Sequence, residues 1–411
     1  MKAISLYTGA GGLDLGLEAA GFETRVALEL DEDAAATLRA NRDWPVISRD
    51  IHDVSSDEIL KVSGLKEGEA DLLVGGPPCQ PFSKAGTWAT GETRRLDDPR
   101  ASTLEQFLRV LRDVKPQTFL LENVPGLGYK GKDEGLVLLT RVIEAINEEI
   151  RTEYQLSVRV LNSVHFGVPQ ERDRVFIVGD RDGGRFRFPN PTHGEGPNDV
   201  QLALEASQPP DGLEPPLTAW DAIGDLQDND DPELAVGGKW AELLPSIPEG
   251  LNYLHHTERG EGLPLFGWRR RFWNFLLKLA KDRPSWTITA QPGSATGPFH
   301  WKSRRLSREE LCRLQTFPEG YRVVGHLRSA HKQLGNAVPA ALAEALGLAI
   351  ARQFFGQEGE RRPTLVPARR RPIPEPEPAS AVPERYLSRL GTHTAHPGTG
   401  LGPGAKARTQ G

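Results

Sequence analysis

The stretch that decides the fold reads Leu72-Leu73-Val74-Gly75-Gly76-Pro77-Pro78-Cys79-Gln80-Pro81-Phe82-Ser83. Its apolar start is typical of a buried strand, and the prolines restrict the backbone that follows. Open α/β sheets bind their ligands at the carboxyl ends of strands, so Cys79 is predicted to lie at a ligand site. A free cysteine is more often a small buried apolar side chain, and the local sequence alone leaves that interpretation open.

Strand and helix patterns alternate on both sides of this stretch. Further short apolar runs occur at 3–7, 26–30, 118–121, 156–160 and 175–178, and helical patterns at 13–20, 33–40 and 103–114. Strands that alternate with helices predict a doubly wound, mostly parallel sheet with helices on both faces. The fold class is therefore predicted to be α/β.

The composition changes along the chain and suggests domain boundaries. Residues 189–250 are rich in Pro, Gly, Asp and Asn, residues 253–308 are basic and aromatic, and a Pro/Arg/Gly-rich segment follows residue 357. We expect a catalytic domain over 1–190 and a smaller inserted domain over 191–320. Residues 321–356 would complete the first domain with a helix, and 357–411 would form a disordered tail.

Length, charge and cysteine usage exclude several classes. The chain has 411 residues with 38% hydrophobic residues and only two cysteines, so neither a disulfide framework nor a zinc site is expected, and the predicted location is a reducing cytoplasm. No membrane-spanning run or signal peptide is expected. The net charge is −6, so any surface that binds nucleic acid must be a local basic patch.

A glycine-rich turn, Tyr7-Thr8-Gly9-Ala10-Gly11-Gly12, joins the first predicted strand to the first helix. Asp14 stands where a dinucleotide fingerprint would have its third glycine, which disfavours a pyrophosphate cofactor. Glu29 ends the second strand, where such folds place a carboxylate on ribose hydroxyls, and Asp50 lies in a third loop. These residues suggest an adenosine-containing ligand without a pyrophosphate, and S-adenosylmethionine fits.

Two further motifs carry candidate chemistry. Glu122 follows the run at 118–121, at the same edge of the sheet as Cys79, while Arg172 and Arg174 share one face of an extended segment. A thiol, a carboxyl and a guanidinium can then converge on one small ring. The Arg-x-Arg pair alone is more often a solvated ion-pair surface.

Taken in order, these motifs resemble those of the DNA (cytosine-5)-methyltransferases of bacterial restriction–modification type. The resemblance runs from about residue 3 to 350 and is carried by Tyr7–Gly12, Glu29, Asp50, Gly75–Ser83, Glu122–Val124, Gln170–Arg174, Arg305–Pro318 and Gln333–Pro339. It implies methyl transfer from S-adenosylmethionine to C5 of a cytosine in a short duplex DNA sequence, after that base has been flipped out.

The resemblance also implies roles for individual residues. Cys79 would add to cytosine C6, Glu122 would hydrogen-bond the N3 edge, and Arg174 would bind O2 with help from Arg172. The cofactor site would be lined by Tyr7, Gly9, Gly11, Gly12, Glu29, Leu30, Asp50, Ile51, Pro78 and Asn336. Contacts to DNA are expected from Gln80, Ser83, Arg100, Arg269, Arg270 and Arg271.

The implied partner is double-stranded DNA, with a restriction endonuclease as a functional rather than a physical associate of a monomeric enzyme. Two other functions stay open: an RNA-directed cytosine methyltransferase, and a non-catalytic DNA-binding regulator on the same fold. A dehydrogenase is the weakest alternative because the glycine spacing is wrong. Cys312 lies in a helical pattern and is predicted to be structural.

Overall fold

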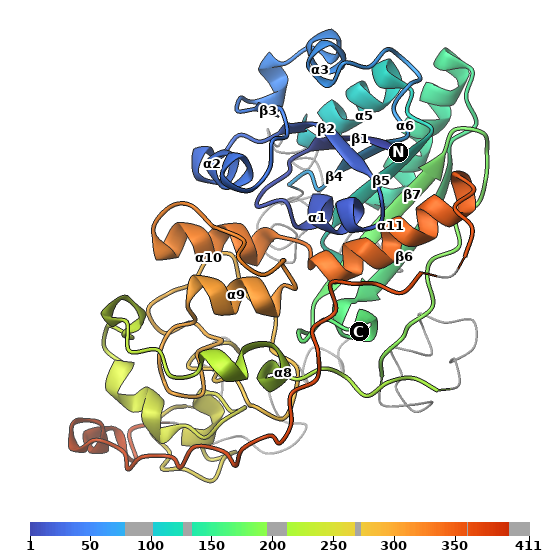
Figure 1. Cartoon of the computed structure of the whole chain (residues 1–411). Helices are drawn as coiled ribbons and strands as arrows, with labels where there is room; N and C mark the ends of the chain where they lie inside the picture. The colour runs from blue at the N-terminus through green and yellow to red at the C-terminus, as the bar shows by residue number, and fades with distance from the viewer. Residues whose placement is uncertain (79–101, 126–133, 195–211, 268–272, 360, 394–411) are drawn as a thin grey trace, which may run out of the picture.

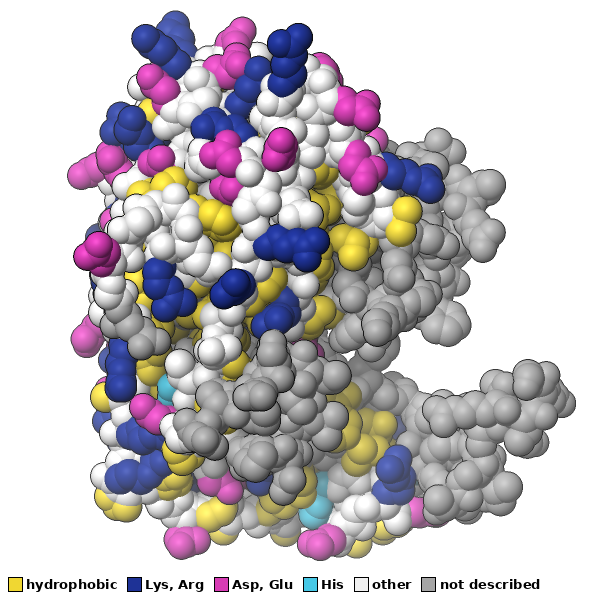
Figure 2. Space-filling view, turned by 90° about the vertical axis from the view of Figure 1, so that its right-hand side faces the viewer, with side chains coloured by type: hydrophobic (Ala, Val, Ile, Leu, Met, Phe, Trp, Pro, Cys, Tyr) yellow, Lys and Arg dark blue, Asp and Glu magenta, His cyan; other side chains and the backbone are white. Residues whose placement is uncertain are grey.

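A computed structural model describes residues 1–78, 102–125, 134–194, 212–267, 273–359 and 361–393 of the chain. Figure 1 shows a lobe built around a sheet and, below it, a second lobe with little regular structure. Basic, acidic and apolar side chains intermingle on the face of the molecule drawn in Figure 2, in keeping with the modest net charge of −6.

Seven strands form one sheet in the order β3-β2-β1-β4-β5-β7-β6. Their bounds are Lys2–Leu6 for β1, Glu23–Leu28 for β2, Val46–Ile47 for β3, Leu72–Gly75 for β4, Thr118–Asn123 for β5, Gln155–Asn162 for β6 and Asp173–Asp180 for β7. Strand β7 runs antiparallel to both of its neighbours, and the remaining pairs are parallel. The predicted mostly parallel α/β sheet is confirmed.

Helices cover both faces of the sheet. Alternate strand residues point to opposite faces, so Leu73 and Phe119 pack in one core while Leu72 and Leu120 pack in the other. The first core is closed by α3 (Ser56–Ser63), α5 (Ser102–Val114) and α6 (Glu134–Ile150), and the second by α1 (Gly12–Ala19) and α11 (Ala340–Phe354). Helices α2 (Glu32–Asn41) and α10 (Leu327–Asn336) flank the carboxyl edge.

Helix α11 brings the late part of the chain back to the first strand. A Cβ atom at Gly16 would lie 2.3 Å from the Ala340 carbonyl oxygen, so only glycine permits this approach of α1 to α11. The stretch Leu327–Phe354 is long and apolar enough to cross a membrane, contrary to the expectation that no run reaches that length, yet its most apolar 18 residues are 89% buried inside the protein. It is a core element.

The second lobe has its own small core. Trp240, Tyr253, Phe266 and Phe299 are buried there among short 3-10 turns. Two short helices, α8 (Ala219–Ile223) and α9 (Arg308–Leu314), lie between this core and the sheet lobe (Figure 1). Cys312 of α9 is buried, and burial raises the pKa of its thiol to about 12, which suits the structural role predicted for it.

The expectation of a disordered tail is wrong for residues 361–393. These residues run from α11 across α8 to the second lobe, where the Tyr386 ring stacks on Trp240 with centroids 5.8 Å apart. The fully buried Glu344 of α11 accepts hydrogen bonds from the backbone N–H groups of Thr364 and Leu365. Specific contacts therefore fix a segment whose composition is typical of disorder. Residues 394–411 lie outside the described part of the chain.

Candidate active site

The glycine-rich turn at the end of β1 leaves an open space at its first glycine. Gly9 has φ +58° and nothing within 4 Å of its Cβ position, so a ligand can approach the backbone there. Tyr7 also has a positive φ, of 57°, and its hydroxyl donates to the Thr103 carbonyl at 2.6 Å. A tyrosine whose backbone adopts the left-handed conformation costs about 1 kcal/mol, and backbone strain of this kind is concentrated at functional sites.

Glu29 holds this turn in place from the neighbouring strand. Its carboxylate accepts the backbone N–H of Gly9 at 2.7 Å and that of Asp31 at 2.8 Å. Burial raises the pKa of Glu29, and these N–H groups oppose the shift. An ionised carboxylate offers about four acceptor positions, so capacity remains to accept a hydroxyl group of a ligand. The side chain of Leu30 beside it is 62% exposed and offers an apolar surface to a flat ring.

Helix α10 brings Asn336 to the same place. Lys332 pairs with Asp31 at 2.7 Å, which lowers the pKa of that carboxyl, and the last residue of the helix is the exposed Asn336. A Cβ at Gly12 would lie 2.2 Å from the Val338 carbonyl oxygen, so the glycine turn and the end of α10 are in direct contact.

The remaining residues predicted to bind the cofactor are Pro78, Asp50 and Ile51. Thr103 donates its hydroxyl to the Pro78 carbonyl at 2.9 Å and accepts from Tyr7, so it joins the loops after β4 and β1. Asp50 accepts the N–H of His52, which lowers the Asp50 pKa, and its own charge contributes to a raised pKa at Tyr7. Ile51 is buried next to it. The cofactor residues predicted from the sequence therefore share one edge of the sheet.

A buried carboxyl and a guanidinium form the centre of the site. The Glu122 side chain at the end of β5 is 11% exposed, and its Oε1 lies 2.7 Å from Nε of Arg174 at the start of β7. Burial raises the pKa of Glu122, while Arg174 and Arg172 oppose the shift. A carboxyl whose pKa is raised by burial holds its proton more strongly than a solvated one, which suits a group that shares a proton with its substrate.

The loop that leads to Cys79 is held against this pair. Asn123 donates its side-chain N–H to the Pro77 carbonyl at 3.0 Å, which joins the loops after β5 and β4. A Cβ at Gly76 would lie 2.8 Å from Glu122 Oε2, so any larger residue would displace the carboxyl. Gly76 is a site residue that sequence reasoning passed over, although its place in the Gly-Gly-Pro-Pro turn was a usable signal.

Arg172 is placed differently from Arg174. It is fully buried and donates to the carbonyls of Ile288 at 3.3 Å and Gly335 at 2.8 Å. Its charge lowers the Glu122 pKa, but its hydrogen bonds join the start of β7 to the second lobe and to α10. Gln170 acts in the same way: it accepts from Ile288 N–H at 3.0 Å and donates to Gln315 at 3.0 Å. Sequence reasoning gave Gln170 no role.

Residues 1–352 match the family described as C-5 cytosine-specific DNA methylase, which is most of the chain. The chain belongs to this family. It is a DNA cytosine-5 methyltransferase, as its motifs suggested.

Curated relatives match over nearly their full length. The Type II methyltransferase M.SacI of Streptomyces achromogenes is 38% identical over 395 residues, which cover 90% of this methyltransferase and 96% of the relative. M.PspPI of Psychrobacter sp. is 34% identical over 366 residues, 85% of this chain and 79% of the relative. M.AquIA of Picosynechococcus sp. is 43% identical over 228 residues, 55% of this chain and 88% of the relative.

Solved structures show the same fold at low sequence identity. A DNA modification methyltransferase encoded within a prophage of E. coli aligns with a TM-score of 0.58 and 21% identity, covering 87% of this chain and 100% of that one. The S. pombe Dnmt2 methyltransferase aligns with a TM-score of 0.53 and 18% identity, covering 86% and 98%. These likenesses bear on the fold alone.

Several predicted residues of the methyltransferase lie outside the described part of the chain. They are Cys79, Gln80, Ser83, Arg100, Arg269, Arg270 and Arg271, so their roles stay predictions. The described site ends at Pro78, directly before the predicted nucleophile.

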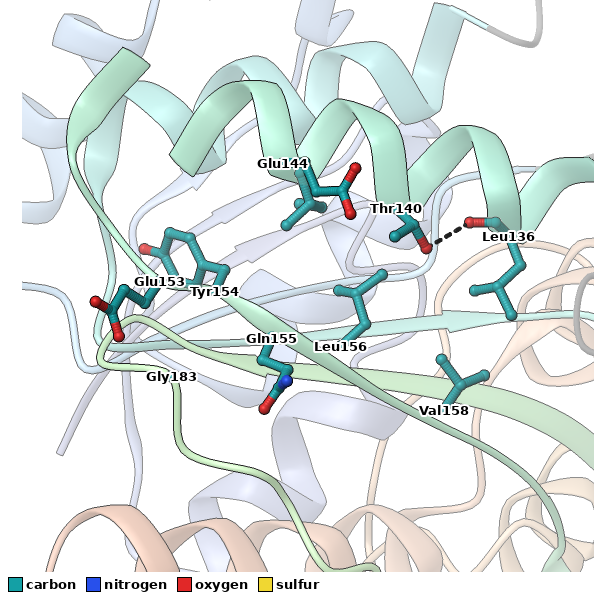
Figure 3. Close-up of a pocket in the computed structure, with 10 residues that line it drawn as sticks. Leu136, Thr140, Glu144, Glu153, Tyr154, Gln155, Leu156, Val158 and Gly183 are labelled. Carbon is teal, nitrogen blue, oxygen red and sulfur yellow. Dashed lines mark hydrogen bonds between the residues drawn. The ribbon is translucent and has the colours of Figure 1, made fainter. Parts of the chain in front are cut away.

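A separate groove of about 560 Å³ lies between α6 and β6. Figure 3 shows Thr140 and Glu144 of α6 facing Leu156 and Val158 of β6 across it. Glu153 and Gly183 also line it, before the start of β6 and after the end of β7. Arg174 lies at the opposite end of these two paired strands, so the groove is not part of the methyltransferase site.

Proposed function

We propose that the protein methylates C5 of cytosine within one short duplex DNA sequence and so protects host DNA from a cognate restriction endonuclease. The matched relatives named Type II methyltransferases support the restriction–modification role. Its place of action would be the cytoplasm, on the cell's own DNA, and it would act as a monomer because one chain supplies both the site and the second lobe. Residues 191–320 would contain the target-recognition domain.

The observed cradle fits S-adenosylmethionine. The open backbone at Gly9, the Glu29 carboxylate and the exposed Leu30 suit an adenosine with free ribose hydroxyls. S-adenosylmethionine supplies the methyl group when it is bound. Tyr7, Gly9, Gly11, Gly12, Glu29, Leu30, Asp50, Ile51, Pro78 and Asn336 would hold it.

The chemistry proposed for the protein's own residues begins with the thiolate of Cys79. Its sulfur would form a bond to C6 of the flipped cytosine, and the electron pair of the C5–C6 double bond would make C5 nucleophilic. Glu122 would donate a hydrogen bond to N3 as negative charge develops on the ring, and Arg174 would bind O2 and orient Glu122. After methylation, loss of the C5 proton and cleavage of the sulfur–C6 bond would restore the ring and the thiolate.

One observation carries this proposal: the buried Glu122–Arg174 pair, 2.7 Å apart, lies beside the Pro77–Pro78 loop that precedes Cys79. A plain surface ion pair would not place a carboxyl of raised pKa next to the two prolines that precede Cys79 in the sequence. Arg172 would act as a positioning residue, because its hydrogen bonds hold the segment that carries Arg174.

The test is to incubate wild type and Cys79→Ala with labelled S-adenosylmethionine and either mixed-sequence duplex DNA or total RNA. We expect label only in DNA, at cytosines of one short sequence read by bisulfite sequencing, and none with Cys79→Ala. Cys312→Ala is the matched control and should retain activity. If only RNA were labelled, the substrate would be RNA and not DNA. If the protein bound DNA but transferred no label, it would be a non-catalytic regulator.

A further inference from the structure

Trp273 stands out among the apolar side chains of the second lobe. It is 56% exposed, and it is the one aromatic among the large exposed hydrophobic side chains of the described residues. A tryptophan left in water forgoes a large burial free energy, so an exposed one suggests a contact partner.

A second tryptophan, Trp286, packs against Trp273. The rings of Trp273 and Trp286 meet edge to face, with centroids 5.6 Å apart. Trp286 is half buried, and its indole N–H has no hydrogen-bond partner within the described ranges. The two rings together are called the ledge, defined here as Trp273 and Trp286.

The ledge is fixed to the segment that carries the active-site arginines. Ser285 N–H donates to the Pro169 carbonyl at 2.8 Å, and the Thr287 hydroxyl donates to the Glu171 carbonyl. Trp286 lies between these two contacts. In an extended chain the step from Glu171 to Arg174 spans about 10 Å, so the backbone contact that holds Thr287, the neighbour of Trp286, lies close to the Glu122–Arg174 pair.

The backbone under Trp273 is also held. The buried Asn252 donates its side-chain N–H to the Trp273 carbonyl at 2.7 Å, and Tyr253 N–H donates to the Phe275 carbonyl at 3.2 Å. A rigid carrier lets an aromatic side chain bind without a large loss of conformational entropy. The exposure of Trp273 therefore does not come from a loosely attached segment.

We infer that the Trp273–Trp286 ledge is a base-stacking contact for duplex DNA at the mouth of the active site. Extrusion of a cytosine leaves unstacked base faces beside the site, and a tryptophan face can cover one of them. The contact recognises the π-face shared by all bases, so it contributes affinity and base extrusion rather than sequence choice. This inference rests on the proposed DNA substrate and on base flipping.

The experiment uses the full chain and a duplex that contains its methylation sequence, with 2-aminopurine in place of the target cytosine as a fluorescent reporter of extrusion. Trp273→Ala should raise the Kd for this duplex between about fivefold and about a hundredfold, the range that loss of one stacked base gives. It should lower the 2-aminopurine signal at saturation. Trp273→Phe should recover most of both, and unfolding temperatures should match wild type because the ring is exposed.

Leu263→Ala is the matched control, since Leu263 is 43% exposed in the same lobe and lies apart from the ledge in sequence. Its Kd and fluorescence should equal those of wild type. If Trp273→Ala and wild type had equal Kd values and equal 2-aminopurine signals, the stacking role of the ledge would be wrong, while the proposed methylation would not be affected. A wild type that does not methylate DNA at all would instead overturn the proposed function.

Discussion

At the residue scale, Glu122 has an environment that controls its proton. Burial raises its pKa and Arg174 and Arg172 oppose this shift, so the proton of Glu122 stays on to a higher pH than on a solvated glutamate. A reaction that needs protonated Glu122 should therefore lose rate as pH rises through its folded-state pKa. We expect Glu122→Gln to lower kcat by about 10² to 10⁴ and to abolish this alkaline decline, because the amide does not titrate there.

The measurement is kcat against pH for wild type, Glu122→Gln and the exposed control Glu105→Gln on α5. An unchanged thermal unfolding temperature in Glu122→Gln would show that the fold is kept. If the variant lost rate but kept the same alkaline decline, another group would have to account for that limb of the profile.

Asp14 is a second buried carboxyl, and it affects the pH dependence of stability. It lies in the first turn of α1, fully buried, and neither carboxylate oxygen accepts a hydrogen bond of good geometry. Burial raises its pKa from 3.8 to about 7, with partial relief from the Ser5 and Thr24 hydroxyls. The folded state thus holds a proton that the unfolded chain releases near pH 4, so Asp14 lowers stability as pH rises from about 4 to about 7.

We expect Asp14→Asn to remove this pH dependence, which amounts to about 4 kcal/mol between the two limits. Its free energy of unfolding, measured in urea at pH 5 and pH 8, should fall less with pH than that of wild type. The exposed Asp43→Asn should follow wild type. Parallel profiles for Asp14→Asn and wild type would mean that Asp14 is ionised in the folded protein.

At the element scale, the segment 361–393 joins the two lobes through buried partners. Glu344 receives its hydrogen bonds from Thr364 and Leu365, and Lys281 pairs with Glu249 and Glu377. Deletion of residues 361–411 removes these groups and leaves polar side chains buried without them. We expect it to lower the free energy of unfolding by at least about 3 kcal/mol. Deletion of 394–411 removes none of these contacts and should leave unfolding unchanged in a urea titration.

This segment also shows where sequence reasoning stopped. The strands were predictable because runs such as Leu72–Val74 and Thr118–Leu121 are apolar and short, and they became β4 and β5. Strand β3 has only two residues and shows no pattern of its own. Helix α6 was not predicted, although Leu139, Ile143 and Ile146 recur at helical spacing.

Contacts between distant segments were the least predictable. Tyr386 stacks on Trp240 and Gln170 binds Gln315, and no local pattern indicates either pair. The Pro-rich composition around Tyr386 even favoured disorder. The motifs predicted which side-chain types form the site and at which edge of the sheet they lie. They could not predict that Arg172 and Arg174 make different contacts, because those contacts depend on residues distant in the sequence.

At the scale of the whole molecule, the segment 170–174 joins the second lobe to the chemistry. Gln170 and Arg172 bind backbone and side chains beyond the sheet, while Arg174 pairs with Glu122. Residues of this one short segment thus divide into those that hold the lobes together and one that would face the proposed substrate. The fixed position of the second lobe relative to Glu122 would then depend on Arg172.

This division predicts different failures for two neighbouring arginines. Arg172→Ala leaves two buried carbonyls, of Ile288 and Gly335, without their donor and creates a cavity, so we expect a loss of about 3 kcal/mol in unfolding free energy and weaker DNA binding. Arg174→Ala should cost less stability than Arg172→Ala, because Glu122 can take up a proton when it loses its partner, and should lower kcat by about 10² or more.

Urea unfolding, DNA binding by fluorescence anisotropy and single-turnover methylation distinguish the two variants. Arg172→Lys provides the intermediate case, since one ammonium group lacks the guanidinium's fork and reaches the two carbonyls less well than arginine. Loss of stability in Arg174→Ala, together with normal stability in Arg172→Ala, would reverse the assignment. The single-turnover rate tests whether Arg172 also affects the chemistry: if Arg172→Lys is folded and binds DNA normally but reacts slowly, its guanidinium positions Arg174 or acts on the substrate, and does not only hold the lobes together.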